Sequence, residues 1–390
     1  MRSAVQFGAG NIGRGFLAQL FHESGLEVVF VDVVQPVIEA INSRGEYTIH
    51  IVGEGAEAAK IDSIRAIDAR NQAASAEAIA NAEIVCTAVG VAHLTKTAPA
   101  IAAGLIIRNE RAASPVNILL CENLHNAAEV LRDAVAVLLP PESRASILSN
   151  TGFVQTVVGR MVPAPTEAER AIDPLAVRVE AYKNLPVDKE AWVGTDPGYV
   201  GIKLVSPFQA YVDRKLFTHN CAHAVLGYLG WEAGCEFGWQ ALEQPAIVAV
   251  LEAVMAETGA ALIKKHGLDP AEHVAHVQGL LRRFKNQDLG DTCIRLARDP
   301  ARKLAPGDRI TGAARCCEEQ GVEPLALATA IASALRYRGP EDPSAEQVAS
   351  DLENIGLDEV LTKYCGILPN EPLAELIRSA VSVGAKAVLG

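Results

Sequence analysis

Three polar residues stand close together in the stretch RKLFTHNCAH, residues 214–223, whose other members are largely apolar. Lys215 can act as a general base if dehydration and a nearby cation lower its pKa. Asn220 can donate to an oxygen that becomes negatively charged, and His223 can orient a substrate. Together these residue types suit the oxidation of an alcohol, in which a base takes the hydroxyl proton while hydride leaves the carbon. Singly, each also fits a plainer interpretation as a solvated or core polar group.

The spacing of these residues predicts that they share one side of a helix. If DRKLFTHNCAHAVLGYLG is a single α-helix, each residue turns by about 100° around the axis. With Lys215 at zero, His223 lies at about 80° and Asn220 at about 140°. Leu216 shares this arc, so we expect a buried helix with one polar notch that a single cleft can receive.

A glycine-rich turn lies near the start of the chain. Gly8, Gly10 and Gly13 form G-x-G-x-x-G between the apolar run SAVQF and an amphipathic helical pattern, and Asp32 ends the next apolar run. This context is typical of dinucleotide binding, with the pyrophosphate at the helix N-terminus and the acid on the ribose. A carboxylate repels a 2′-phosphate, which favours NAD over NADP, whereas FAD shares the fingerprint; a tight turn without a ligand is the alternative. The residues expected to contact the cofactor are Phe7, Gly8, Ala9, Gly10, Asn11, Ile12, Gly13, Arg14, Asp32 and Val89.

Asn123 ends the predicted strand NILLCEN. Ligands of doubly wound sheets bind at the carboxyl ends of the strands, so we expect Asn123 to lie towards the nicotinamide. A turn residue that caps the following helix is almost as good an interpretation of its position.

Strand and helix patterns alternate along the first half of the chain. The runs SAVQF, LEVVFVDV, EIVCTAV and VNILLCEN predict buried strands separated by helices, and LAVRVEAYKN predicts one more strand. This alternation indicates a Rossmann-type doubly wound parallel sheet. Helical patterns dominate after the turn-rich stretch GTDPGYVG. We therefore expect an α/β dinucleotide-binding domain over residues 1–197 and a mainly α-helical substrate domain over residues 198–390.

Composition narrows the possible functions. The formal net charge is −12 and no basic run stands out, which argues against nucleic-acid binding. We find neither a signal peptide nor an apolar run approaching about 18 residues, so we expect a cytoplasmic protein without a membrane span. The eight cysteines include no C-x-x-C pair, and we expect reduced thiols and no metal site. Nothing in the sequence indicates an oligomeric state.

These segments resemble the polyol-specific long-chain dehydrogenases, and among them the branch that acts on mannitol 1-phosphate. The resemblance covers essentially the full length and includes FGAGNIGRGF, CEN, RKLFTHNCAHA, ETGAALIKKHG and RKLAPGDR in the same order. It implies a Rossmann-type domain, a helical domain and an active site in the cleft between them. It also implies Lys215 as general acid/base, Asn220 and Asn123 as the oxyanion-stabilising pair, and His223 as the residue that orients the substrate. The implied reaction converts D-mannitol 1-phosphate and NAD to D-fructose 6-phosphate and NADH.

The chain departs from this family where Cys221 and Ala222 replace threonine and glycine, which bears on local packing and substrate preference. His219 is expected to be a neighbour without a catalytic role. The substrate's phosphate requires basic residues, for which the candidates are Arg283, Arg302, Lys303 and Arg309, each with surface charge as the alternative. Two other functions remain open: another polyol or hexuronate oxidoreductase without a phosphate clamp, and a non-catalytic NAD sensor.

Overall fold

The chain forms two compact units, residues 1–208 and 209–390. The computed structural model describes residues 2–53 and 55–389. The boundary expected at residue 198 lies in the loop that precedes the last strand of the first unit.

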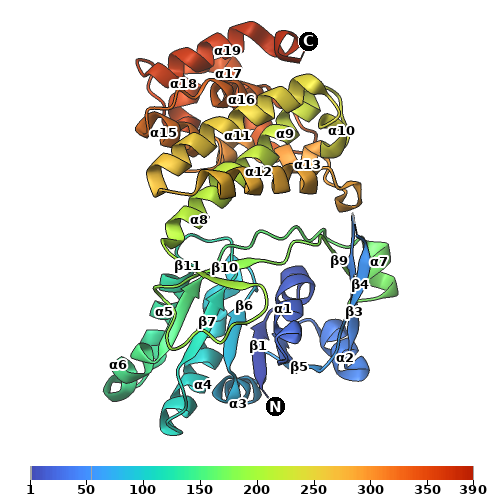
Figure 1. Ribbon diagram of the computed structural model, residues 1–390, viewed down its shortest axis with the longest axis vertical. Coiled ribbons are helices and arrows are strands. Elements are labelled where there is room, and N and C mark those ends of the chain that lie inside the picture. The colour runs from blue at the N-terminus through green and yellow to red at the C-terminus, as the bar shows by residue number, and fades with distance from the viewer. Residues whose placement is uncertain (1, 54, 390) are drawn as a thin grey trace. The chain divides into compact units, whose positions relative to one another are not determined.

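A parallel sheet of six strands forms the centre of the first unit, in the order β5-β2-β1-β6-β7-β8 (Figure 1). Its strands are β1 Ser3–Phe7, β2 Glu27–Asp32, β5 Ile64–Asp68, β6 Ile84–Thr87, β7 Val116–Leu120 and β8 Thr151–Gln155. All five pairings are parallel. The predicted Rossmann-type doubly wound sheet is therefore confirmed, and β1 lies between β2 and β6, where the strand order reverses.

The helices of the first unit cover both faces of this sheet. They are η1 Gly13–Leu17, α1 Ala18–Glu23, α2 Gln35–Arg44, α3 Gln72–Asn81, η2 Val91–Thr97, α4 Ala98–Glu110, α5 Ala127–Leu138 and α6 Pro141–Ser149. A further short helix, α7 Glu167–Ile172, has no buried residue and lies beside one of the smaller sheets (Figure 1). Successive side chains of a strand point to opposite faces. In β2, Val28 and Phe30 accordingly belong to one apolar core, and Val29 and Val31 to the other. This double burial explains why the strands read as continuous apolar runs.

Two smaller sheets complete the first unit. One has the order β4-β3-β9 and the other pairs β10 with β11. Their strands are β3 Tyr47–Ile51, β4 Glu57–Ile61, β9 Val177–Val179, β10 Leu185–Asp188 and β11 Ile202–Val205. The run LAVRVEAYKN does form a strand, β9, but it pairs with β3 in the smaller sheet and not with the central one.

The second unit is helical, and none of its described residues belongs to a named strand. Its helices are α8 Phe208–Arg214, η3 Lys215–Asn220, α9 Cys221–Glu232, α10 Gly238–Ala241, α11 Pro245–His266, α12 Pro270–Phe284, η4 Gln287–Leu289, α13 Cys293–Ala297, α14 Pro300–Lys303, α15 Thr311–Glu319, α16 Leu325–Arg336, α17 Pro343–Asn354, α18 Leu357–Val360, η5 Leu361–Cys365 and α19 Pro372–Leu389. The predicted helical second domain is confirmed.

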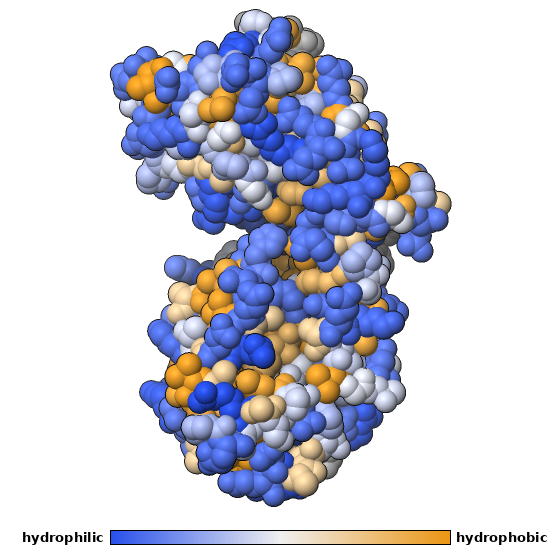
Figure 2. All heavy atoms as spheres, turned by 90° about the vertical axis from the view of Figure 1, so that its left-hand side faces the viewer, coloured by the Kyte–Doolittle hydropathy of each residue, from blue (hydrophilic) through white to orange (hydrophobic). Residues whose placement is uncertain are grey.

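Helix α11 is central to this unit. It packs against α9, α12, α15, α16 and α19. Among the described residues it is the one helix whose length and hydropathy would allow it to cross a membrane. A helix in the middle of a helical core is also expected to be apolar, and its packing accounts for its composition. Exposed apolar side chains elsewhere are scattered among polar ones, as the face shown in Figure 2 illustrates.

Candidate active site

The glycine turn after β1 is shaped by close backbone contacts. Gly8 has a φ of 90°, a conformation that side chains rarely adopt, and a Cβ there would collide with the carbonyl of Ala88. A Cβ on Gly13 would collide with the carbonyl of Gly8. Gly10, in contrast, is exposed, and a Cβ there would meet nothing within 4 Å. Two of the glycines are therefore needed for the fold of the turn, and the third leaves open space where a pyrophosphate can approach.

Asp32 connects this turn to the end of β2. Its Oδ2 accepts from the backbone N–H of Ala9 at 2.6 Å, and its Oδ1 accepts from Val33 and Val34 at 2.7 and 2.9 Å. A carboxylate has further lone pairs for ribose hydroxyls. Arg14, in contrast, is buried and donates to the carbonyl of Ala9, so its side chain supports the turn from inside. The donors, the open space at the turn and the carboxylate fit an adenine dinucleotide without a 2′-phosphate.

Glu122 is a buried carboxylate at the carboxyl ends of β6 and β7 that the sequence did not single out. It accepts from Thr87 Oγ1 at 2.7 Å and from the N–H of Val89 at 3.1 Å, and burial raises its pKa. The expected cofactor residue Val89 is thus held against Glu122, and the next residue, Asn123, is exposed in the turn after β7. The motif CEN contains this glutamate, but the sequence alone does not show that the side chain is buried, because its partners Thr87 and Val89 come from the end of the neighbouring strand β6 and the residues after it.

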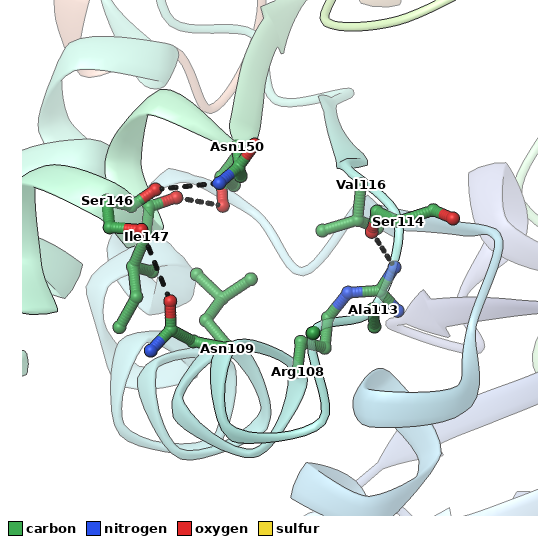
Figure 3. Close-up of a pocket in the computed structure, with 11 residues that line it drawn as sticks. Arg108, Asn109, Ala113, Ser114, Val116, Ser146, Ile147 and Asn150 are labelled. Carbon is green, nitrogen blue, oxygen red and sulfur yellow. Dashed lines mark hydrogen bonds between the residues drawn. The ribbon is translucent and has the colours of Figure 1, made fainter.

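Two cavities of the first unit lie away from these residues. One, of about 300 Å³, is lined by residues such as Arg108, Val116 and Ile147 at the amino end of β7 (Figure 3). Its arginine is already engaged with carbonyls, including that of Ser114 at 2.6 Å. The other, of about 610 Å³, lies beside β3 and α7, where Arg44 pairs with an aspartate. Neither cavity includes the glycine turn. The first lies at the amino end of the parallel sheet, whereas ligands of such sheets bind at the carboxyl ends of the strands.

The lysine segment of the second unit is not one continuous α-helix. Residues Lys215–Asn220 form a π-helical turn, η3, between α8 and α9, and the N–H of Cys221 donates to the carbonyl of Leu216 five residues earlier. Residues joined by such i to i+5 bonds lie roughly one turn apart, so Lys215 and Asn220 are aligned along the helix. His223 follows Asn220 by three residues in α9 and continues the same face. All three are partly exposed.

The helix buries its other side. Phe217, Thr218 and His219 in η3, and Cys221 and Ala222 in α9, are buried. The two residues that differ from the family pattern therefore face the core, and their effect is on packing. His219 is also enclosed, and burial holds the pKa of its imidazole well below the usual range. It is neutral near pH 7.

The environment of Lys215 favours its neutral form. Burial lowers the pKa of its ammonium group to about 8, and the Arg309 guanidinium acts in the same direction, whereas Asp308 opposes it. A lysine with a pKa near the working pH can both accept and return a proton. Asn220 makes no hydrogen bond through its side chain within the described part of the chain, so its amide is available to a ligand.

The ring of His223 is held on two sides. It stacks on Phe284, with ring centroids 4.3 Å apart and an angle of 10° between the planes. Its Nε2 lies 3.2 Å from Oδ2 of Asp291. The ring of His219 approaches both His223 and Phe284 edge-on, at 5.5 Å in each case. Asp291 was not singled out in the sequence, which offers no local signal for a contact 68 positions away.

The four candidate phosphate residues differ in their surroundings. Arg309, near Lys215, donates through Nε to Asp308 at 2.7 Å, and its terminal nitrogens make no hydrogen bond to any described residue. Arg302 pairs with Asp299 at 2.8 Å. Lys303 is buried and donates to the carbonyl of Leu296, and burial lowers the pKa of its ammonium group to about 7. Arg283 lies in the last turn of α12, close enough to His219 to lower its pKa.

Within residues 2–53 and 55–389, no group of three or more His, Cys, Asp or Glu side chains is arranged to hold a metal ion. All eight cysteines are free, as expected, although Cys86 and Cys121 bring their sulfur atoms to 3.6 Å.

Solved structures establish the class of fold. The chain is similar to a Pseudomonas fluorescens mannitol 2-dehydrogenase solved as a ternary complex with NAD and D-mannitol, with a TM-score of 0.73, 19% identity, and coverage of 100% of this chain and 93% of the other. It is also similar to a D-sorbitol dehydrogenase in substrate-free form, with a TM-score of 0.81, 17% identity, and coverage of 100% and 95%. The chain thus has the fold of the two-domain polyol dehydrogenases.

Sequence comparison defines the family. The mannitol dehydrogenase Rossmann domain matches residues 2–200, and the mannitol dehydrogenase C-terminal domain matches residues 207–386. A mannitol-1-phosphate 5-dehydrogenase of Brevibacillus brevis (strain 47) is 38% identical over 375 residues, which cover 96% of each chain. The chain belongs to the mannitol dehydrogenase family and is an oxidoreductase, as the resemblance implied.

Proposed function

We propose that the protein catalyses the reversible, NAD-dependent oxidation of D-mannitol 1-phosphate to D-fructose 6-phosphate, with Lys215 as general acid/base and without a metal ion. The reaction is the one named for the Brevibacillus relative, which matches nearly the full length of the chain. The structural observation that carries the chemistry is Lys215, whose pKa of about 8 suits proton transfer and which shares a helix face with Asn220 and His223. The cytoplasmic location stays a prediction from the sequence.

The cofactor site in this proposal is the turn from Phe7 to Arg14, with Val89 beside it. Backbone N–H groups at the start of the helix hold the pyrophosphate, and Asp32 accepts from the ribose hydroxyls. Its negative charge disfavours the 2′-phosphate of NADP. Bound NAD supplies the chemistry of hydride acceptance from the alcohol carbon.

The proton and the oxygen are handled by the chain's own side chains. Neutral Lys215 takes the hydroxyl proton as the carbonyl forms, and in the reverse direction the ammonium group returns it. The amides of Asn220 and Asn123 donate to the oxygen as negative charge develops there. His223 orients the substrate. Asn123 is in the first unit and the other three are in the second, so the proposal requires both units to reach one substrate.

The substrate's phosphate is assigned to Arg309 first among the four candidates. Its Nε is fixed by Asp308, and its terminal nitrogens remain for a phosphate in a paired geometry. Arg283 and Arg302 are secondary candidates. Lys303 already donates to a carbonyl inside the unit, and its role in phosphate binding would require that contact to break.

Steady-state reduction of fructose 6-phosphate, with NADH and NADPH compared, tests the proposal. We expect turnover with NADH, much weaker turnover with NADPH, and little reduction of free fructose. The same assay after treatment with a chelator tests metal independence, for which we expect no loss. A preference for the unphosphorylated sugar would contradict the assigned substrate, and NADH binding without turnover on any polyol or ketose would indicate a cofactor sensor.

A further inference from the structure

The loop after β7 carries Asn123, and it is anchored to the neighbouring strands on both sides. In the central sheet β7 lies between β6 and β8. On the side of β6, the carboxylate of Glu122 accepts from Thr87 Oγ1 and from the N–H of Val89. On the side of β8, the anchoring residue is Gln155, the last residue of that strand.

The side-chain amide of Gln155 makes three hydrogen bonds to the backbone that follows Asn123. Its Nε2 donates to the carbonyls of Leu124 and His125, at 2.7 and 2.9 Å. Its Oε1 accepts from the N–H of Ala128 at 3.0 Å. Carbonyls only accept and a backbone N–H only donates, so these partners also determine which way the amide is turned. Both N–H groups of the amide are used to hold the loop.

The oxygen of the same amide caps helix α5. Ala128 lies in the first turn of α5, where backbone N–H groups have no partner within the helix. Asn126, which precedes the helix, makes no capping hydrogen bond through its side chain. Gln155 therefore supplies the cap from the neighbouring strand. The two ends of its amide have different tasks, because the oxygen caps a helix and the nitrogen holds the loop.

The side chain of Asn123 is left available between these anchors. It is exposed, and it makes no hydrogen bond to any residue in the described part of the chain. The backbone before the loop is also fixed, because buried Thr156 donates through Oγ1 to the carbonyl of Leu120 at 2.8 Å. An amide that is available to a ligand thus stands on a backbone whose neighbours on both sides are held in place.

We propose that Gln155 is a positioning residue for the reaction, whose amide nitrogen holds the loop after β7 so that the side chain of Asn123 meets the substrate oxygen at hydrogen-bond distance. This role rests on the proposed function, in which Asn123 donates to that oxygen as negative charge develops. A donor of this kind is effective because it is already in place and needs no rearrangement during the reaction. A displacement of about 1 Å is sufficient to lower the rate roughly 100-fold.

Two substitutions separate the tasks of the Gln155 amide. Gln155→Glu keeps an oxygen for the N–H of Ala128 but, when ionised, turns only lone pairs towards the two loop carbonyls. Gln155→Met has a side chain of similar length and removes all three hydrogen bonds. Loss of the loop contacts is therefore common to both variants, whereas loss of the helix cap is specific to Gln155→Met.

Kinetics and cofactor binding are measured on both variants. In the reduction of fructose 6-phosphate we expect each to lower kcat/KM roughly 10- to 100-fold, mainly through kcat, because the donor acts as charge develops. NADH affinity, measured by fluorescence titration, should stay unchanged, since the glycine turn and Asp32 lie outside this loop. Asn109→Asp is the matched control. It makes the same change from amide to carboxylate in an exposed residue of the first unit, beside the cavity at the amino end of β7 (Figure 3), and should retain wild-type kinetics.

A double-mutant cycle tests whether Gln155 acts through Asn123. In the Asn123→Ala background the amide donor is gone, so displacement of its loop has nothing left to misplace. We therefore expect Gln155→Glu to add little further loss of kcat/KM in that background. A general effect on folding would instead multiply the two losses.

The wild-type protein offers a measurement that depends on no variant. In ¹H–¹⁵N spectra of glutamine-labelled protein, both Nε2 protons of Gln155 should exchange with water more slowly than those of Gln72. Gln72 is exposed, and its side chain makes no hydrogen bond to a described residue. Equal exchange at the two side chains would overturn the role of Gln155 even if neither variant folded.

Other results would also overturn this role. They are wild-type kinetics of a folded Gln155→Glu protein, NADH affinity that falls in step with turnover, and multiplicative losses in the double variant. Wild-type kinetics of Asn123→Ala would remove the donor role of Asn123 and the role of Gln155 with it, but would leave the reaction in place. Absence of fructose 6-phosphate reduction by the wild type would instead refute the proposed function, while the exchange rates would still show whether Gln155 holds the loop.

Discussion

Lys215 and Asn220 are the first and last residues of a single π-helical turn, η3. The turn aligns a base with an amide donor that an α-helix would have placed about 140° apart around its axis. Helices with such a turn have one residue more than regular geometry requires, and these turns are frequent at functional sites. The wider turn also leaves Phe217, Thr218 and His219 on the buried side.

Replacement of Lys215 by alanine is expected to abolish turnover while cofactor binding is retained. The turn Phe7–Arg14 that binds the dinucleotide in our proposal belongs to the first unit, whereas Lys215 belongs to the second. Loss of a proton-transfer group that works with partners costs several orders of magnitude. Turnover is measured by NADH oxidation, and binding by NADH fluorescence. Lys203→Ala, an exposed lysine of β11, is the matched control; a Lys215→Ala protein with wild-type turnover would disprove the assignment.

The pH profile should follow the ionisation of Lys215. Oxidation needs the neutral amine, so kcat/KM for mannitol 1-phosphate should rise with pH and level off above about 8. Reduction needs the ammonium form and should decline as pH rises through the same range. The two directions, measured in one buffer series, should show opposite trends with a shared midpoint.

Two neighbouring substitutions should move that midpoint in opposite directions. Arg309→Gln removes a positive charge that lowers the pKa of Lys215, so the midpoint should rise. Asp308→Asn removes a negative charge that raises this pKa, so the midpoint should fall, even though Asp308 also anchors Arg309. Shifts of the same sign in both variants would show that a different group controls the profile.

The glycine turn offers a pair of substitutions that separate folding from binding. Gly10→Ala adds a methyl group where no protein atom lies within 4 Å, so we expect an unchanged Tm and a large loss of NADH affinity. Gly13→Ala forces the helix away from the Gly8 carbonyl, so both stability and binding should fall, with a stability loss of about 1–3 kcal/mol. Calorimetry and NADH titration measure the two effects. Normal NADH binding by Gly10→Ala would place the pyrophosphate elsewhere.

Sequence reasoning succeeded where the determining interactions are local. The turn from Gly8 to Gly13 was predictable from the spacing of its glycines. The strands β1, β2, β6 and β7 were predictable as short apolar runs, because each strand is buried on both faces. The strand partner of β9 was not predictable, because its alternating pattern does not distinguish one sheet edge from another.

The candidate site was predicted in its residue types but not in its geometry. Apolar periodicity cannot reveal a π-turn, since a single inserted residue leaves the surrounding pattern helical. The partners of His223 and Lys215 come from distant segments: Asp291 follows α12, and Arg309 precedes α15. Their proximity depends on how the helices pack, which no local signal encodes.

Buried Lys303 should make stability depend on pH. Its folded pKa is about 7, well below the unfolded value, so between pH 7 and about 10.5 the unfolded chain binds a proton that the folded protein does not. This lysine therefore makes the free energy of unfolding increase with pH across that window. The cost of burying its charge is fully present below pH 7. Lys303→Met keeps the length of the side chain without the charge, so its Tm relative to wild type should be highest at pH 7 and decline towards pH 10. Thermal unfolding at several pH values, without substrate, measures the difference. Exposed Lys203→Met should run parallel to wild type, and a parallel curve for Lys303→Met would mean that the buried lysine titrates normally.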